Sequence, residues 1–165
     1  PENIAKVCRM QSHVTHNNPV SDAAVDCVVA MIHKAMRGNS LEEIQAGPVK
    51  DLLETYPKFQ YASKRNLNPS AYIVDTFRVV LNSLFSTDSF EQCLIDVVNR
   101  GGDADTTGAI AGMVAGAYYG LESIPRQWLK SVDNKIMTNC RFQAVELIDF
   151  AKRTQTDQFS FIQET

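Results

Sequence analysis

The residues best suited to chemistry lie in the stretch NRGGDADTTG, in the second half of this 165-residue chain. Gly101 and Gly102 precede two carboxylates, Asp103 and Asp105, and the hydroxyl of Thr106 follows. Glycine permits positive φ and close approach of a ligand to the backbone. A helix of small and apolar residues comes next, so the carboxylates lie near unpaired N–H groups and the positive end of a helix dipole. Oxygen ligands suit Mg, Mn or Ca rather than Zn or Cu. The stretch predicts a hard-metal or phosphate site at a helix N-terminus.

Three other interpretations of this stretch explain less of it. A plain helix cap needs one aspartate, which leaves the second aspartate and both glycines unexplained. An EF-hand loop needs a bidentate Glu at the place where this chain has Val114. A membrane span needs a longer apolar run than the one from Thr107 to Gly120. A buried helix of a water-soluble protein, packed closely on a neighbour, is the better account.

The stretch GGDADTTGAIAG, residues 101–112, resembles the second metal-binding motif of the ADP-ribosylglycohydrolases. It is most like the branch of the dinitrogenase reductase-activating glycohydrolase. The match continues at YIVDTF (72–77), IPRQWL (124–129) and THNNP (15–19), so it covers most of the chain in the family's order. The resemblance implies a compact, all-α, multi-helix orthogonal bundle that lacks the N-terminal part of the family's domain. It also implies hydrolysis of the N-glycosidic bond between ADP-ribose and a protein arginine.

The resemblance assigns the metal ligands and catalytic residues to this motif. Asp103, Asp105 and Thr106 would bind two divalent cations, Mn²⁺ or Mg²⁺, and the two aspartates would be the catalytic residues. Asp105 lies at the centre of the motif and is expected to bridge both ions. Two such ions can orient the ribose hydroxyls and lower the pKa of a bound water.

The resemblance also implies four residues that contact the substrate. His16 would lie beside the ADP-ribose pocket, Tyr72 would pack on the ligand, and Gly101 and Gly102 would leave room for the terminal ribose. The residues themselves leave other roles open for His16. It could form a metal pair with His13, although no carboxylate or cysteine companion stands nearby, or it could bond only to local backbone groups.

One part of the family's pattern is missing from this chain. The family's other metal ligands form an earlier motif, a hydroxyl residue followed by paired aspartates, and the chain contains no Asp-Asp pair. The family's N-terminal acidic residue, a candidate general acid or base, is missing as well. We therefore expect a fragment of a larger enzyme, a chain completed by an N-terminal segment or a second chain, or a degenerate form that keeps half of the ligands.

Two functions follow from these expectations. The first is a divalent-metal-dependent hydrolase that removes ADP-ribose from an ADP-ribosylated protein, with dinitrogenase reductase as one candidate substrate. The second is a non-catalytic helical module that binds ADP-ribose or metal. The sequence leaves open whether the bond is arginine-linked or oxygen-linked, and whether the metal is Mn or Mg.

Composition limits the class of protein. With 44% hydrophobic residues, 165 residues can bury one core, which predicts a single domain over residues 1–165. A net charge of -3 and the lack of a basic run argue against nucleic-acid binding, and no membrane span is expected. Four widely spaced cysteines without a Cys-x-x-Cys pair predict reduced, buried thiols in a cytoplasmic protein.

The hydrophobic pattern predicts helices throughout, because alternating strand patterns are nearly absent. In the first half of the chain, the expected features are a helix over 4–14, a helix capped by Ser21 and Asp22 that ends at Gly38, a capping box at Ser40–Glu43, a kink at Gly47-Pro48 and a loop over 56–70. A helix over 71–85 capped by Ser70 follows, and then a capping box at Asp88–Glu91 before a helix through Val98. The remainder is expected to form the glycine-rich helix up to Gly120, a short helix opened by Pro125, a last helix over 139–153 and a polar tail from Thr154.

Overall fold

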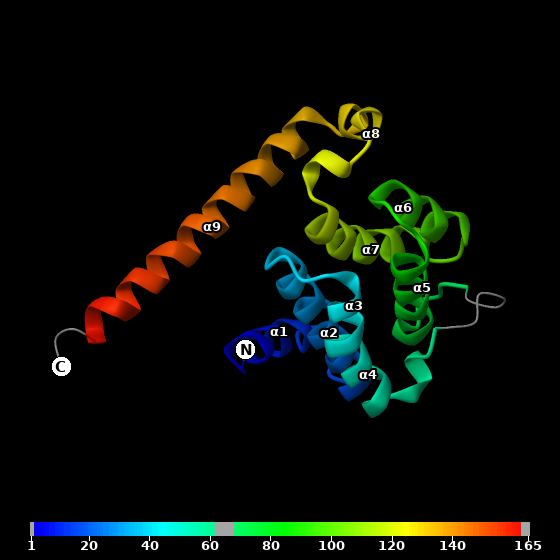
Figure 1. The fold of residues 1–165 in the computed structure, drawn as a ribbon, viewed down its shortest axis with the longest axis horizontal. Coiled ribbons are helices and arrows are strands. Elements are labelled where there is room, and N and C mark those ends of the chain that lie inside the picture. Colours follow the sequence, from blue (N-terminus) through cyan, green and yellow to red (C-terminus); the bar gives the residue numbers. More distant parts are fainter. Residues whose placement is uncertain (1, 62–67, 163–165) are drawn as a thin grey trace. The chain divides into compact units, whose positions relative to one another are not determined.

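The computed structural model describes the backbone of residues 2–61 and 68–162 and the side chains of residues 6–61 and 68–153. Every regular element in these ranges is a helix, which confirms the all-α class. The elements are α1 (Glu2–Ser12), α2 (Pro19–Met36), α3 (Leu41–Ile44), the π-helical turn η1 (Gln45–Val49), α4 (Lys50–Thr55), the 3-10 turn η2 (Pro57–Phe59), α5 (Ile73–Ser86), α6 (Phe90–Asn99), α7 (Ala104–Tyr119), the 3-10 turn η4 (Leu121–Ser123), α8 (Arg126–Ser131) and α9 (Asn134–Ile162) (Figure 1).

The chain divides into two compact units, Pro1–Ile124 and Pro125–Thr165. The first unit holds α1 to α7 and all the residues expected to carry chemistry. The second unit consists of α8 and the 29-residue helix α9. The single domain predicted for residues 1–165 stays a prediction.

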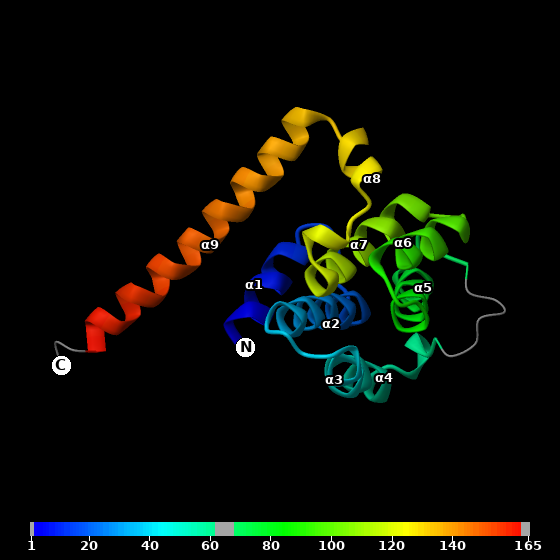
Figure 2. The ribbon, with the colours of Figure 1, turned by 45° about the horizontal axis from the view of Figure 1, so that its top comes forward.

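Helix α5 provides the centre of the first unit's core. The apolar residues whose spacing of three and four predicts this helix are all buried, namely Val74, Phe77, Leu81 and Leu84, and the last three are fully inaccessible to solvent. Helix α7 packs against α2, α5 and α6, as the views in Figures 1 and 2 agree. The site motif at the start of α7 therefore begins a helix that packs directly on the core helix α5.

Three glycines of α7 at four-residue intervals, Gly108, Gly112 and Gly116, face α6. A Cβ added at Gly112 would lie 3.9 Å from Leu94, which is ordinary van der Waals contact. The helices are neighbours, as the small residues predicted, but the approach leaves room for a methyl group.

The start of α2 corrects one predicted helix cap. Asn18 caps the helix, because its side-chain oxygen accepts a hydrogen bond from the backbone N–H of Val20 at 2.8 Å. Pro19 takes the first helical position, where its missing N–H has no partner to lose. The cap predicted at Ser21 and Asp22 is wrong because both residues lie inside the first turn. This frees the Asp22 carboxylate for contacts outside its own helix.

Two capping boxes were predicted, and one is displaced. In the first, the Ser40 hydroxyl accepts from the Glu43 N–H at 3.3 Å, and the Glu43 carboxylate accepts from the Ser40 N–H at 2.8 Å, as expected. The second was placed at Asp88–Glu91, but Ser89 caps α6 by accepting from the N–H of Gln92 at 3.2 Å. Serine and aspartate are equally good caps, so the sequence could not choose between neighbouring candidates.

The last helix is longer than its apolar pattern predicted. It spans 134–162 rather than 139–153, because the Asp133 side chain accepts hydrogen bonds from two backbone N–H groups at 2.8 and 3.2 Å and starts the helix earlier. Among the side chains described for this helix, large apolar residues such as Phe142 and Leu147 are exposed.

Two expectations fall partly outside the described residues. Residues 62–67 of the loop predicted over 56–70 are not described, whereas the turn η2 just before them buries Phe59. The side chains of the predicted polar tail, including Phe159 and Phe161, also lie outside the described ranges.

The four cysteines are free, but only two of them are buried. Burial raises the pKa of the Cys27 thiol to about 12 and that of the Cys93 thiol to about 11. Cys8 is half-buried and Cys140 is exposed, so the prediction of four buried thiols is wrong for these two. No helix in the described part of the chain is long and apolar enough to cross a membrane.

We expect the substitution Gly112→Ala to stabilise the protein. Glycine inside a helix costs about 0.5–1 kcal/mol relative to alanine, and the added methyl meets only ordinary contacts. Urea unfolding should therefore show a gain of about that size. A loss of stability would mean that α6 and α7 lie closer together than the structure places them.

Candidate functional site

A cavity of about 650 Å³ brings together residues from three separate parts of the first unit. His16 comes from the loop between α1 and α2, Tyr72 from the residue before α5, and Asp103 and Thr106 from the start of α7. Four of the seven predicted site residues therefore line one cavity. Asp105, Gly101 and Gly102 are not among its lining residues, although they belong to the same turn of chain.

Two consecutive glycines with positive φ connect α6 to α7. Gly101 has φ +70° and Gly102 has φ +61°, a region that side-chain-bearing residues rarely adopt. A Cβ added at Gly102 would collide with the backbone carbonyl oxygen of Pro69, whereas nothing lies within 4 Å of one added at Gly101. Gly102 is thus required by a close backbone approach, and the space for a ribose expected at this residue stays a prediction. The open side of Gly101 leaves that role as a prediction.

The first turn of α7 leaves the Asp103 side chain available for a ligand. Asp103 occupies the N-cap position, but its side chain makes no capping hydrogen bond. Its backbone carbonyl accepts instead from the N–H of Thr107 at 3.0 Å and from the Thr107 hydroxyl at 2.7 Å. Thr107 is fully buried, so these bonds fix the backbone at Asp103. A plain helix cap is therefore not the role of this aspartate.

The Asp105 carboxylate is stabilised in its charged form. Its pKa is lowered from the ordinary value, first by a hydrogen bond from the backbone N–H of Thr106 and then by a hydrogen bond shared with Asp103. Two carboxylates within hydrogen-bonding reach of each other repel when both are ionised, and a cation between them removes that repulsion.

The oxygen donors at the start of α7 fit a hard divalent cation. The described residues contain no group of three or more His, Cys, Asp or Glu side chains that could hold a metal ion. The donors that the motif does bring together, two carboxylates and the Thr106 hydroxyl, are all oxygen atoms. Such a set suits Mn²⁺ or Mg²⁺ and does not suit zinc.

A network of hydrogen bonds shapes the turn that carries Tyr72. The Ser70 hydroxyl accepts from the N–H of Tyr72 at 3.1 Å and donates to the Asp75 carboxylate at 2.9 Å. The Ser70 carbonyl accepts from the Thr76 hydroxyl at 2.5 Å. Ser70 was expected to cap the helix, which is wrong, because α5 makes no side-chain cap and Ser70 orders the preceding turn instead. The Tyr72 side chain remains 51% exposed and lies on the cavity.

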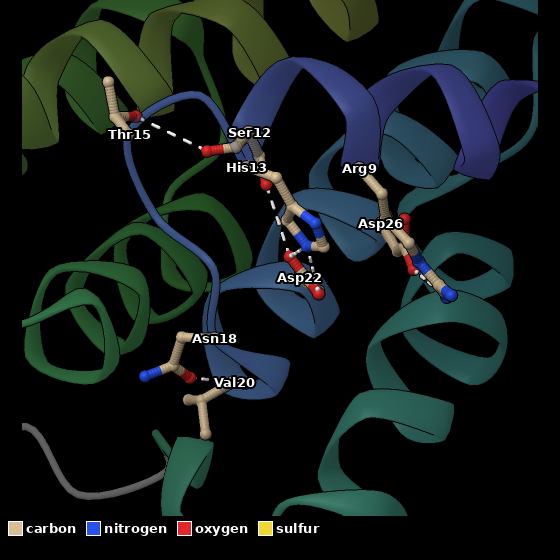
Figure 3. A network of polar contacts seen from close by, with 8 residues as sticks. All are labelled: Arg9, Ser12, His13, Thr15, Asn18, Val20, Asp22 and Asp26. Atoms are coloured by element: carbon tan, nitrogen blue, oxygen red, sulfur yellow. Dashed lines mark hydrogen bonds and ion pairs between the residues drawn. The ribbon is translucent and has the colours of Figure 1, made fainter.

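The loop that carries His16 is held at its start by an ion pair. The Nε2 atom of His13 lies 2.9 Å from one oxygen of Asp22 and 3.1 Å from the other, and the Ser12 hydroxyl donates to the same carboxylate at 3.2 Å. Figure 3 shows the imidazole and the hydroxyl directed at this carboxylate. His16 is exposed, with its Nδ1 atom 3.0 Å from the Thr15 hydroxyl. His13 is therefore occupied by Asp22, which does not favour the alternative of a His13–His16 metal pair.

Sequence reasoning missed the carboxylates of α2. Arg9 donates to Asp26 at 2.9 Å, while the other Asp26 oxygen is buried without a hydrogen-bond partner (Figure 3). Both residues line a second cavity, of about 660 Å³, which includes none of the predicted site residues. The only available signal was the position of two acids on an otherwise apolar helix, which a solvated helix face would also produce.

Comparison with known proteins decides the family. The family model described as ADP-ribosylglycohydrolase matches residues 1–158. The chain belongs to the ADP-ribosylglycohydrolase family. A solved structure described as an ADP-ribosylglycohydrolase-related protein complex superposes with a TM-score of 0.69 and 28% identity, over 79% of this chain and 48% of that one. The expected fold is thereby confirmed.

Two curated relatives illustrate how far the similarity extends. The ADP-ribosyl-[dinitrogen reductase] glycohydrolase of Rhodospirillum rubrum is 42% identical over 141 residues, 86% of this chain and 47% of that protein. The ADP-ribosylarginine hydrolase Tri1 of Pseudomonas putida (strain GB-1) is 32% identical over 130 residues, 74% of this chain and 34% of that protein. The chain thus spans about half or less of the length of these relatives.

The two glycines of the loop offer a matched pair of substitutions. Gly101→Ala should cost about 1–2 kcal/mol through its positive φ alone. Gly102→Ala has the same backbone penalty and must also displace the Pro69 carbonyl, so it should cost more. Urea unfolding of both variants measures the difference. Equal losses would show that Pro69 does not press on the loop.

The ion pair at Asp22 predicts a dependence of stability on pH. The pKa of the Asp22 carboxyl is lowered from the ordinary 3.8, chiefly by the hydrogen bond from His13. A lowered folded-state pKa gives stability that is present above the unfolded-state value and is lost as the pH falls through the folded-state value. Wild type should therefore exceed Asp22→Asn in unfolding free energy at pH 7, and the gap should close below about pH 4. His13→Gln should shrink the same gap, and no gap at pH 7 would refute the role of the pair.

Proposed function

We propose that this chain forms the second metal-binding half of the active site of a divalent-metal-dependent hydrolase. The reaction removes ADP-ribose from a modified protein side chain by hydrolysis of an N-glycosidic bond. One observation carries the proposal, namely the cavity that joins Asp103 and Thr106 at a helix N-terminus to His16 and the exposed ring of Tyr72. Nothing in the packing of α7 alone requires carboxylates behind two glycines.

Each residue has a distinct part in the proposed site. Asp103, Asp105 and Thr106 are the oxygen ligands, and the N–H of Thr106 keeps Asp105 ionised. When bound, two divalent cations supply the positive charge that orients sugar hydroxyls and activates water. The ring of Tyr72 packs on the ligand, and His16 donates or accepts a hydrogen bond at the sugar or phosphate.

The names of the relatives support a choice of substrate. The Pseudomonas putida protein is called an ADP-ribosylarginine hydrolase, and the Rhodospirillum rubrum protein is named for ADP-ribosylated dinitrogen reductase. We therefore favour arginine as the modified side chain and dinitrogenase reductase as a candidate protein substrate. The proposed metal is Mn²⁺ or Mg²⁺, and the proposed location is the cytoplasm.

The proposed site needs further ligands. Two carboxylates and one hydroxyl supply only a few of the roughly twelve oxygen positions around two hexacoordinate cations, and waters and substrate oxygens would have to fill most of the rest. We propose that an N-terminal segment or a second chain contributes the paired aspartates of the family's earlier motif. The length of the relatives is consistent with such a segment, since this chain spans 47% of the Rhodospirillum rubrum protein.

A second candidate function is a non-catalytic module that binds ADP-ribose or metal. It is favoured by the cavity itself, because His16, Tyr72, Asp103 and Thr106 already line one pocket within this chain. In this alternative, ligand binding needs no additional segment, and catalysis never appears.

Calorimetric titration of Mn²⁺ into the 165-residue chain, with and without ADP-ribose, tests the proposal. We expect Mn²⁺ binding that ADP-ribose strengthens and that Asp105→Ala abolishes, because this variant removes the ionised carboxylate. Gly112→Ala is the matched control, since it lies on the same helix and faces α6.

Complementation separates the two functions. Adding the remainder of the Rhodospirillum rubrum relative should produce release of ADP-ribose from ADP-ribosylarginine. Activity that appears only on addition supports a divided enzyme. Binding without activity after this addition would support the non-catalytic module, and the absence of Mn²⁺ and ADP-ribose binding even after the addition would refute both functions.

A further inference from the structure

The loop that carries the carboxylates has little rigidity of its own. Gly101 and Gly102 have no side chains, and glycine has more backbone freedom than any other residue. Whatever fixes Asp103 must therefore act from the ends of the loop or from its side. The downstream end is held by the bonds of Thr107 to the Asp103 carbonyl, and the side is held by Pro69. The upstream end is Arg100.

The Arg100 side chain connects two helices immediately before the glycines. Its Nε and Nη2 atoms donate to one carboxylate oxygen of Asp96 at 3.1 and 2.6 Å. The same Nη2 atom donates to the side-chain oxygen of Asn82 at 2.8 Å. Asp96 belongs to α6 and Asn82 to α5, so a single guanidinium bridges both helices at the point where the loop begins.

The acceptors of Arg100 are themselves fixed. The Ser83 hydroxyl donates to the same oxygen of Asp96 at 2.6 Å, and the Asn82 amide donates to the carbonyl of Tyr61 at 2.9 Å. Asn82 and Ser83 are buried, and the Arg100 side chain is only 13% exposed. An exposed i, i+4 ion pair adds little to stability and fixes nothing beyond its own helix. Here the arginine is mostly buried although the Asp96 side chain is 37% exposed, and the arginine also reaches a second helix.

Both the tyrosine and the carboxylate loop of the site are attached to helix α5. Tyr72 stands at its N-terminus, and Asn82 and Ser83 lie on it. Through Arg100, the start of the carboxylate loop is attached to the same helix that carries the ligand-facing tyrosine.

We propose that Arg100 is a positioning residue for the metal-binding loop, holding Gly101 to Asp105 in register with α5. The inference rests on the proposed function, since it concerns the metal site assigned there. Arginine is suited to this role because its planar guanidinium offers several N–H groups in fixed directions, whereas the lysine ammonium is a point charge on a flexible stem. Arg100 itself is not among the residues that line the cavity.

The test compares Arg100→Met and Arg100→Lys with Arg78→Met in the 165-residue chain. Arg78 is a matched control, because it lies on the core helix α5, to which Arg100 is bonded, and donates through Nε to the backbone carbonyl of Gln60 at 2.7 Å. Calorimetry gives the Mn²⁺ dissociation constant, and urea unfolding gives the stability of each variant. NMR records the backbone amide signals of Gly101, Gly102 and Asp103.

We expect Arg100→Met to weaken Mn²⁺ binding roughly 10- to 100-fold, as for other partners that orient metal ligands. The three loop amide signals should shift or broaden, and Arg100→Lys should recover part of the affinity. Arg78→Met should lose stability yet bind Mn²⁺ within about twofold of wild type, because it shares no partner with the loop.

Two results would overturn the inference. One is Arg100→Met with unchanged affinity and unchanged loop signals. The other is a loss of affinity in Arg78→Met equal to that in Arg100→Met, which would reflect general destabilisation. If wild type binds no Mn²⁺, the proposed function fails for this chain, and the loop signals alone decide whether Arg100 positions the loop.

Discussion

The close approach of the Gly102 backbone to the Pro69 carbonyl is the constraint on which the candidate site depends. It joins two segments that are far apart in sequence, the carboxylate loop before α7 and the turn that carries Tyr72 before α5. Only a residue without a side chain permits this contact, and the positive φ of the same residue excludes most alternatives independently. One backbone contact thus aligns the proposed metal ligands with the proposed ligand-stacking ring.

The ion pairs of the first unit lie outside the carboxylate loop. Among the described residues, the ion pairs of the first unit join Arg9, His13 and Arg100 to other aspartates and Lys50 to Glu54, and none involves Asp103 or Asp105. The nearest favourable partners of Asp105 are N–H groups at the start of α7. The loop therefore carries negative charge without a protein cation beside it, which is the condition that a bound metal ion satisfies. The surrounding pairs fix the framework and leave that charge uncompensated.

The sequence predicted the helical class, the buried stripe of α5 and the motif at α7 because each follows from local periodicity or from a distinctive run of residues. Four of the predicted site residues line one cavity, although they come from three parts of the chain. The failures have physical causes. Adjacent Ser, Asp and Asn residues compete as helix caps, so the starts of α2 and α6 were misplaced. Contacts such as Gly102 with Pro69, His13 with Asp22 or Arg100 with Asn82 depend on tertiary packing and leave no periodic signal. The exposed apolar residues of α9 were indistinguishable from core positions by spacing alone.

The cysteine thiols of the two units differ in their exposure to solvent. Cys27 and Cys93 are buried in the first unit with strongly raised pKa values, whereas Cys140 is exposed on α9 in the second. A thiolate is the reactive form, so alkylating reagents at neutral pH reach the two buried residues last, the half-buried Cys8 of the first unit before them, and the exposed Cys140 first. A fluorophore attached there reports the unfolding of α9, while the tyrosines of the first unit report that of the core. The native sequence therefore contains its own means of determining whether the two units unfold in one cooperative step or in two.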